Sequence, residues 1–142
     1  MIELSIRPAT DADAAELARL NGLFNGATLS PAEQAEHLHA AAGTERAVLA
    51  WVDGHAVGFA CLRFARLITL ARPYAEVTEL FVEEAFRRRG IARALLADAE
   101  ILAQSHGAPG VILFTGLKNE SAQAFYRAVG YHDYAITMRK VF

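Results

Sequence analysis

The sequence predicts an α/β fold in which helices cover the faces of a mixed central sheet. Segments with alternating apolar and polar residues, typical of half-buried strands, are interleaved with segments whose apolar residues recur every three to four positions, typical of amphipathic helices. A strand-helix-strand unit in the middle of the chain indicates parallel strands, and an earlier hairpin indicates antiparallel ones. The predicted order is β-α-α-β-β-β-α-β-α-β, in one domain over residues 1–142.

Composition excludes several other classes. The 142 residues are 54% hydrophobic and 21% charged, which suits a chain that builds a core without a metal or disulfide staple. No apolar run approaches the roughly 18 residues of a membrane span, and Cys61 alone permits no internal disulfide. The start, Met1-Ile2-Glu3-Leu4, lacks the features of a signal peptide. We therefore expect a cytoplasmic protein without a membrane partner.

The first third of the chain predicts one strand and two helices. Residues 2–7 alternate apolar and polar, and Pro8 ends the strand. A capping box of Thr10 and Asp13 precedes the first helix, and the stronger signal Ser30-Pro31-Ala32-Glu33 begins the second. The apolar face of the first helix comprises Ala14, Leu17, Ala18 and Leu20.

The middle of the chain predicts strands followed by a long helix. Residues 47–52 and 55–64 form a hairpin around Asp53-Gly54, and residues 74–82 form a further strand. From Gly90 the apolar period becomes helical. The apolar positions are Ala92, Leu95, Leu96, Ala99, Leu102 and Ala103.

The last third predicts a strand, a short helix and a closing strand. Gly107 and Pro109 end the long helix, and residues 111–115 read as a fully buried strand. The short helix covers residues 120–129 and the last strand residues 131–141.

Charge is unevenly distributed along the chain. The net charge of −2 rules out a globally basic nucleic-acid binder, and residues 1–45 carry −5 against +3 for the remainder. Within that remainder four arginines crowd the start of the long helix: Arg87, Arg88, Arg89 and Arg93. This cluster predicts a local anion site. The alternative is a solvated basic helix start whose arginines balance Glu83 and Glu84.

The segment from Glu79 to Arg93 carries the most chemical information. A strand runs into a turn at Gly90 and a helix begins at once, so unpaired backbone N–H groups converge where the helix dipole is positive. Such a turn suits a diphosphate. Gly90 lets the backbone approach the ligand, and Ala92 keeps the first helical turn thin. The dinucleotide-binding and P-loop patterns are absent, which disfavours a nucleoside triphosphate enzyme.

Two motifs here resemble those of the GCN5-related N-acetyltransferase (GNAT) family. Arg87-x-x-Gly90-x-Ala92 is similar to the family's acetyl-CoA motif, and residues 119–131, from Asn119 to Tyr131, are similar to its N-x-x-A-x-x-F-Y-x-x-x-G-[FY] stretch. The resemblance implies acetyl-CoA as cosubstrate. The coenzyme-binding residues that it implies are Phe81, Val82, Arg87, Arg88, Arg89, Gly90, Ile91, Ala92, Arg93 and Asn119. Asn119 could also act only as a helix cap.

The resemblance also assigns the proton donor. In the family the tyrosine matching Tyr126 donates a proton to the departing thiolate, although an aromatic pair on a short helix is otherwise typical of core. In the family the fourth strand bulges at the position of Leu80-Phe81-Val82, directly after Glu79, and the resemblance implies that a free backbone N–H of Phe81 or Val82 polarises the thioester carbonyl. The amine needs a base, and we prefer Glu79 to Glu76 or a water chain. A strand period of two puts these carboxylates on opposite faces.

The remaining reactive residues suggest structural roles. His37 and His39 are two apart on a predicted helix without a ligand partner, so no metal is expected. Cys61 and Trp51 are predicted to be core residues.

The sequence therefore predicts an N-acetyltransferase that moves an acetyl group directly to a primary amine of a small molecule or peptide. The acidic first 45 residues favour a cationic acceptor. The sequence does not decide between a monomer and a homodimer. A non-catalytic acyl-CoA sensor or regulatory module would keep the phosphate turn without needing Tyr126 and Glu79. A small interaction domain without coenzyme would leave the arginine cluster unexplained.

Overall fold

The computed structural model describes residues 3–142, which divide into two compact units, the first ending at residue 112 and the second covering residues 113–142. Each unit is described by itself. The first contains β1 (Leu4–Pro8), η1 (Asp11–Asp13), α1 (Ala14–Asn25), α2 (Pro31–Ala41), β2 (Glu45–Val52), β3 (His55–Ala65), β4 (Tyr74–Val82), η2 (Glu84–Phe86) and α3 (Ile91–Ser105). Strand β5 (Ile112–Leu113) lies at the boundary, and the second unit contains α4 (Glu120–Ala128). No helix within residues 3–142 is long and apolar enough to cross a bilayer.

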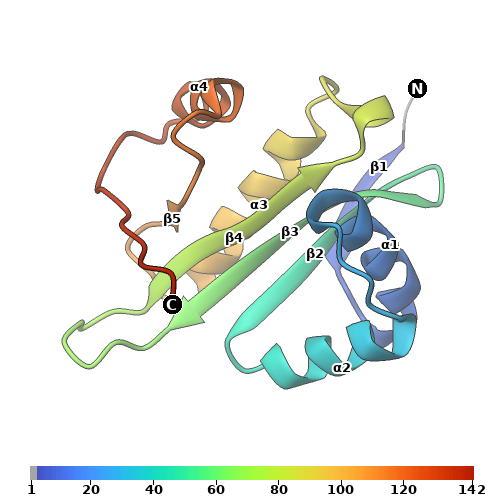
Figure 1. Cartoon of the computed structure of the whole chain (residues 1–142), viewed down its shortest axis with the longest axis horizontal. Coiled ribbons are helices and arrows are strands. Elements are labelled where there is room, and N and C mark those ends of the chain that lie inside the picture. The colour runs from blue at the N-terminus through green and yellow to red at the C-terminus, as the bar shows by residue number, and fades with distance from the viewer. Residues whose placement is uncertain (1–2) are drawn as a thin grey trace. The chain divides into compact units, whose positions relative to one another are not determined.

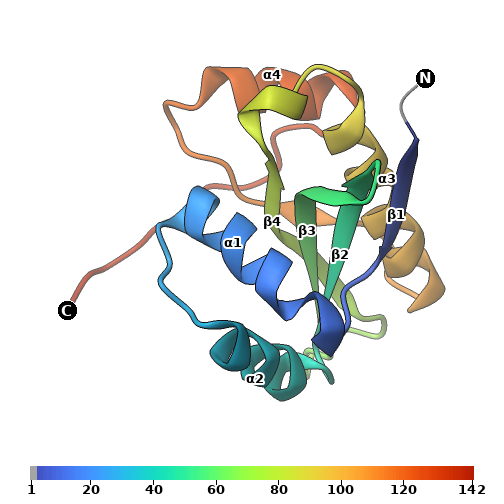
Figure 2. The ribbon, with the colours of Figure 1, turned by 90° about the vertical axis from the view of Figure 1, so that its right-hand side faces the viewer.

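The sheet of the first unit is built by successive antiparallel neighbours. Strands β1 to β4 pair in chain order, and β5 follows β4 in the sheet. Asp53 and Gly54 join β2 to β3 with φ angles of 49° and 82°, the positive values that a two-residue hairpin turn requires. Helices α1 and α2 lie on one face of the sheet and α3 lies on the other (Figures 1 and 2). The predicted α/β class is confirmed.

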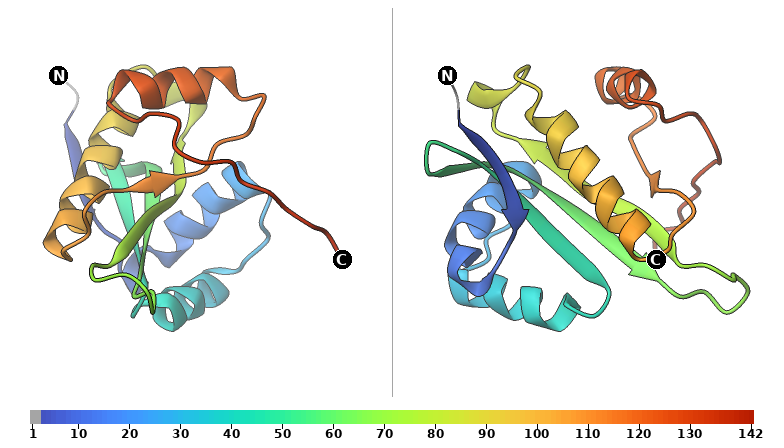
Figure 3. Two further views of the ribbon diagram at one scale, coloured as in Figure 1. Left: turned by 90° about the vertical axis from the view of Figure 1, so that its left-hand side faces the viewer. Right: turned by 180° about the vertical axis from the view of Figure 1, so that it is seen from behind.

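Alternation along the strands supplies one apolar core to each face. In β2, Val48 and Ala50 face α3, whereas Leu49 between them faces α1. The α3 core consists of Val48, Ala50, Val52, Val57, Ala60, Val82, Ile91 and Leu95. The α1 core consists of Leu17, Leu20, Leu49, Ala56 and Phe59. Helix α3 runs along β3 and β4, which places its first turn beside the end of β4 (Figure 3, right).

Both predicted helix starts are confirmed. The hydroxyl of Ser30 accepts the Glu33 N–H at 3.1 Å, and the Glu33 carboxylate accepts the Ser30 N–H at 2.7 Å. The Asp13 carboxylate accepts the Thr10 N–H at 2.9 Å, and a bidentate pair with Arg7 at 2.8 and 3.0 Å satisfies its remaining lone pairs. Asp13 is only 6% exposed, so this pair holds the junction between β1 and α1.

Two predicted strands differ from the structure. The strand predicted over 111–115 is only the two residues of β5, and both are partly exposed rather than fully buried. The strand predicted over 131–141 is wrong, because residues 131–142 adopt no helix or strand within the described chain. Their alternating side chains, such as Tyr134, Ile136 and Met138, are 78 to 89% exposed. An apolar alternation makes a strand only where a neighbouring backbone pairs with it.

Candidate active site

The turn between β4 and α3 presents unpaired backbone donors. Gly90 caps α3 with a left-handed φ of 80°, and Arg88 also has a positive φ of 62°. No side chain in residues 3–142 accepts a hydrogen bond at this cap, so the N–H groups of the first helical turn stay available. A Cβ placed on Gly90 would meet no atom within 4 Å. The turn thus offers open space and positive dipole ends, which suit a diphosphate.

The arginine cluster surrounds this turn, and one member also stabilises it. Arg87 donates through Nε to the carbonyl of Val82 at 2.8 Å, so it fastens the turn to the end of β4. The side chains of Arg88, Arg89 and Arg93 are exposed. Glu83 pairs with Arg19 of α1 at 2.8 Å, rather than with the arginines of the turn. This pair weakens the interpretation that the arginines only balance Glu83 and its neighbour.

The hydrogen-bonding pattern along β4 distinguishes the two candidate backbone donors, Phe81 and Val82. The Glu83 N–H donates to the Val57 carbonyl of β3 at 2.8 Å. Because N–H directions alternate along a strand, the Phe81 N–H also points toward β3, and the Val82 N–H points away from it. Of the two residues that the sequence proposes, Val82 is the one that can offer its N–H to a ligand.

The β-bulge of β4 lies at Thr78, earlier than predicted. Cys61 of β3 is paired with Glu79, but the next residue, Leu62, is paired with Val77, so Thr78 is an extra residue. The bulge therefore lies before Glu79, whereas residues 79–82 pair regularly with β3.

This bulge also overturns the prediction that Glu76 and Glu79 face opposite sides of the sheet. Their partners on β3, Arg63 and Cys61, are two residues apart and so share one face. The inserted Thr78 changes the phase of the strand, which puts the two carboxylates on the same side. A period of two holds only where pairing is uninterrupted.

The two carboxylates are nevertheless in different environments. Glu76 is 7% exposed and accepts from Arg63 at 3.0 Å and from the Tyr74 hydroxyl at 2.7 Å, so its oxygens serve the fold. Glu79 is half-buried on β4. Burial raises the pKa of Glu79 above its ordinary value, a rise that Asn25 opposes and Glu45 reinforces. A half-buried carboxylate with a raised pKa suits a proton acceptor better than a carboxylate held in an ion pair does.

Groups distant in sequence surround Glu79. The Thr78 hydroxyl donates to the Glu45 carboxylate at 3.3 Å. Three rings lie on the same side of the sheet: Phe24 stacks on Phe81 at a centroid distance of 5.0 Å, and Phe59 lies 6.1 Å from each. Sequence reasoning missed Phe24, Asn25 and Glu45 as site residues, because only the packing of α1 and β2 against β4 brings them together.

The second unit contains the other two predicted site residues. Asn119 caps α4, since its Oδ1 accepts the Ala122 N–H at 3.2 Å. Tyr126 is half-buried, with the rings of Phe125 and Tyr131 at 5.3 and 5.9 Å. Burial raises the pKa of Tyr126 above its ordinary value of about 10, so the phenol is protonated at neutral pH and can donate.

The residues predicted to be structural have structural partners. His39 pairs with Asp11 at 2.8 Å, and no group of three or more potential ligands that could hold a metal occurs among residues 3–142. Burial raises the pKa of the Cys61 thiol, which suppresses the reactive thiolate. Trp51 lies under the guanidinium of Arg7, 4.4 Å from the ring centroid.

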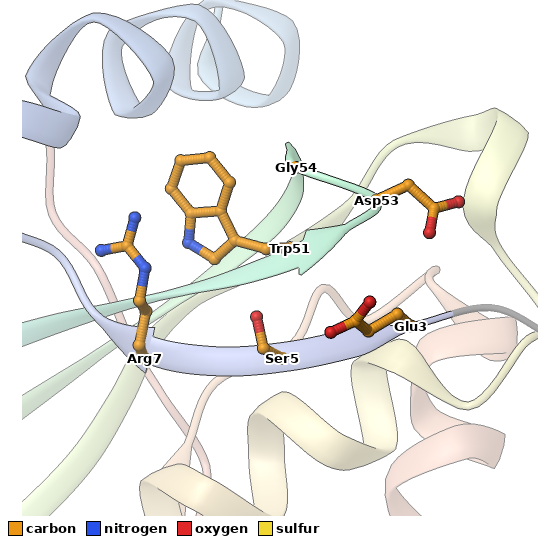
Figure 4. Close-up of a pocket in the computed structure, with 6 residues that line it drawn as sticks. All are labelled: Glu3, Ser5, Arg7, Trp51, Asp53 and Gly54. Atoms are coloured by element: carbon orange, nitrogen blue, oxygen red, sulfur yellow. The ribbon is translucent and has the colours of Figure 1, made fainter.

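Trp51 also lines a hollow of about 420 Å³ beside β1. Ser5 and Arg7 project from β1 toward it, Glu3 lines it just before that strand, and the Asp53-Gly54 turn closes one side (Figure 4). None of the predicted site residues lines this hollow, so it is separate from the end of β4.

Comparison with known proteins assigns the chain. The model of the acetyltransferase (GNAT) family matches residues 14–131, which include both motifs. The chain belongs to the GNAT family. An uncharacterized N-acetyltransferase of Methanocaldococcus jannaschii is 35% identical over 83 residues, 58% of this GNAT chain and 37% of the relative's length. The present chain thus spans little more than a third of that relative.

Solved structures share the GNAT fold. An acetyltransferase of Trypanosoma brucei superposes with a TM-score of 0.87 at 23% identity, covering 99% of this chain and all of that one. The aminoglycoside N-acetyltransferase AAC(6')-Iy, in complex with CoA, gives a TM-score of 0.82 at 22% identity, with 99% and 96% of the two chains covered. At these identities the likeness concerns the fold.

Proposed function

We propose that this GNAT protein transfers the acetyl group of acetyl-CoA directly to a primary amine, as a single N-acetyltransferase domain over residues 1–142. One observation carries the proposal. The uncapped start of α3 and the outward N–H of Val82 lie at the same end of β4, where one ligand could place its diphosphate on the first and its thioester carbonyl on the second. The CoA complex of AAC(6')-Iy supports coenzyme binding by this fold.

Coenzyme binding is assigned to the turn and its neighbours. The backbone N–H groups from Gly90 to Arg93 would hold the diphosphate, with Ile91 and Ala92 in the first helical turn. The exposed guanidinium groups of Arg88 and Arg89 would add charge-assisted contacts. Asn119, besides capping α4, would contact the coenzyme from the second unit.

The transfer needs one base and one acid. An acceptor arrives as an ammonium ion, and Glu79 takes its proton, directly or through water. The free amine nitrogen then bonds to the thioester carbon, whose oxygen the Val82 N–H stabilises, and the carbon–sulfur bond breaks. Tyr126 donates its proton to the departing thiolate, which leaves as the CoA thiol. Once bonded to the acetyl carbon, the nitrogen loses its second excess proton to solvent, and Tyr126 regains a proton from solvent while Glu79 releases the one it took. No bond between enzyme and acetyl group forms at any step.

A cationic acceptor fits the surroundings of Glu79. Glu45 adds a second carboxylate, and the Phe24 and Phe81 rings offer apolar faces that attract cations. A small-molecule amine or a peptide amine in the cytoplasm would meet these requirements. AAC(6')-Iy is by name an aminoglycoside acetyltransferase, which supports an amine acceptor for this fold.

Two measurements test the proposal in sequence. Acetyl-CoA at 100 times its dissociation constant should stabilise the protein by about 2.7 kcal/mol in thermal unfolding, and an interaction domain without coenzyme would show no shift. A panel of polyamines, amino acids, aminoglycosides and peptides is then assayed for acetyl-CoA-dependent thiol release. Stabilisation without release on any amine would contradict the enzyme and favour the acyl-CoA sensor.

A further inference from the structure

Strand β1 lies at one edge of the sheet, and its outer side is open. The strand order β1-β2-β3-β4-β5 puts it at the end of the sheet (Figure 2), and within residues 3–142 no strand pairs with its outer side. Four of its five residues are exposed, and the fifth, Ile6, is partly buried. Such an edge offers backbone N–H and C=O groups to a further strand.

The pairing with β2 decides which backbone groups of β1 point outward. Just after β1, the Ala9 N–H donates to the Ala47 carbonyl of β2 at 2.9 Å. Because these directions alternate along an antiparallel strand, odd-numbered residues of β1 bond to β2 and even-numbered ones point away from it. The N–H and C=O groups of Leu4 and Ile6 therefore face the open edge. Pro8 belongs to the same outward series, where its missing N–H costs no bond to β2.

The side chains of this edge are sorted by face. Ile6 packs against the α3 core, so Leu4, two residues earlier, lies on the same face of the sheet. Glu3, Ser5 and Arg7 lie on the opposite face, where they line the hollow beside Trp51 (Figure 4). One face of the edge is thus apolar, and the other carries one acid and one base on either side of Ser5.

We propose that β1 is a self-association surface, which pairs antiparallel with β1 of a second copy of this chain about a two-fold axis at Ser5. In this register Leu4 lies opposite Ile6 of the second copy. Both residues point their backbone groups outward, so the two symmetric pairs form four backbone hydrogen bonds. The sheets of the two copies then form one continuous sheet.

The same register also pairs the charges. Glu3 lies opposite Arg7 of the second copy, and the two-fold axis makes this pair twice. The Arg7 guanidinium gives one N–H from each Nη to Asp13 and is 46% exposed, so its other N–H groups can reach a further carboxylate. A shift by two residues, the smallest that keeps the hydrogen-bonding pattern, would lose both ion pairs.

Analytical ultracentrifugation over a concentration series tests the association. The sedimenting mass of the wild-type chain should rise toward twice the monomer mass. Glu3→Lys places like charges opposite each other in both pairs and should raise the dissociation constant of the dimer by about tenfold. Glu36→Lys, at an exposed position of α2, makes the same change of charge away from β1 and should keep the wild-type constant.

Two results of this series would overturn the proposal. One is a wild-type chain that stays monomeric at about 1 mM, where even a weak specific complex forms. The other is a dimer whose dissociation constant is the same in Glu3→Lys and in Glu36→Lys. Neither readout depends on acetyl transfer, so the proposed function and this surface stand or fall separately.

Cysteine cross-linking tests the register. Ser5→Cys, in a Cys61→Ala background, places two thiols at the two-fold axis, in a pair whose Cα atoms lie about 4.5 Å apart and within disulfide reach. Mild oxidation should give a covalent dimer on a non-reducing gel. Leu4→Cys in the same background lies diagonally, about 7 to 8 Å from its copy, and should stay monomeric. A covalent dimer from Leu4→Cys, or none from Ser5→Cys, would refute pairing about Ser5.

Discussion

Nη1 of Arg19 lies 2.8 Å from Oε1 of Glu83, and its Nη2 lies 2.7 Å from the carbonyl oxygen of Ala56. One guanidinium on α1 therefore joins the beginning of β3 to the residue that follows β4. Val82, whose N–H is assigned to the thioester carbonyl, directly precedes Glu83. The ion pair thus holds the strand end on which this donor is placed.

Replacing Arg19 by methionine should lower the free energy of unfolding by about 1 to 2 kcal/mol, because the buried Ala56 carbonyl loses its charged donor while the partly exposed ion pair contributes less. Urea unfolding measures this loss. Arg66→Met, at an exposed position after β3, is the matched control and should change stability by less than about 0.5 kcal/mol. Equal effects of the two variants would remove the special role of Arg19.

Gly90→Val should weaken CoA binding at least tenfold, about 1.4 kcal/mol, since the branched side chain enters the open space where the phosphate is expected. Isothermal calorimetry gives the affinity. Gly26, with a positive φ of 67° and no atom within 4 Å of an added Cβ, lies at the end of α1, so Gly26→Val controls for backbone strain. Wild-type affinity in a folded Gly90 variant would place the diphosphate elsewhere.

Tyr126→Phe should reduce kcat by about 10² to 10⁴ and leave the CoA dissociation constant nearly unchanged, because only the proton donor is lost while the ring stays. The assay is thiol release with the acceptor found in the amine panel. Tyr134→Phe, at an exposed position, should keep full activity. Undiminished turnover of Tyr126→Phe would mean that water or another residue protonates the thiolate.

Glu79→Gln should lower kcat at neutral pH and recover part of the loss at higher pH, where the acceptor loses its proton in solution. In the wild-type protein, activity should fall as the pH drops toward the raised pKa of Glu79, since the carboxylate becomes protonated. Glu76→Gln should instead lower the melting temperature, because it disturbs the ion pair with Arg63. It should not change the pH at which the activity falls. A pH profile of Glu79→Gln parallel to that of the wild type would exclude Glu79 as the base.

Asp13 should make stability depend on pH in the acidic range. The hydrogen bond from Arg7 lowers the pKa of Asp13 below its unfolded value, so its contribution is complete above about pH 5 and is lost as the pH falls through the folded pKa. Asp13→Asn should destabilise the protein by about 2 kcal/mol at pH 7 and by much less at pH 2. Urea unfolding at both pH values checks this, and a pH-independent difference would contradict it.

The sequence predicted those parts of the site that are contiguous in the chain. β4 was expected over 74–82 and is found there, since its apolar residues are adjacent and Gly90 marks the helix start. Local hydrogen bonds, as at Ser30, were equally predictable because both partners lie within one turn. These features depend on neighbours in sequence.

Other parts depend on how separate segments pair. The position of the bulge at Thr78 follows from the register with β3, which residue spacing in β4 does not contain. Asn25 and Glu45 approach Glu79 from other elements, and neither shows a motif of its own. The expected strand over 131–141 had the right alternation but lacks a paired backbone in the described chain.

Thr78 also bears on how this chain is aligned with others and how it tolerates deletions. Removing this one residue would make the pairing with β3 continuous, with Glu79 still opposite Cys61 and Glu76 still opposite Arg63. Glu76 would stay on the same side of the sheet as Glu79, and its ion pair with Arg63 would be kept. A one-residue gap at any other position of β4 would instead turn the residues on one side of it to the opposite face, so an alignment of this strand should place its gap at Thr78.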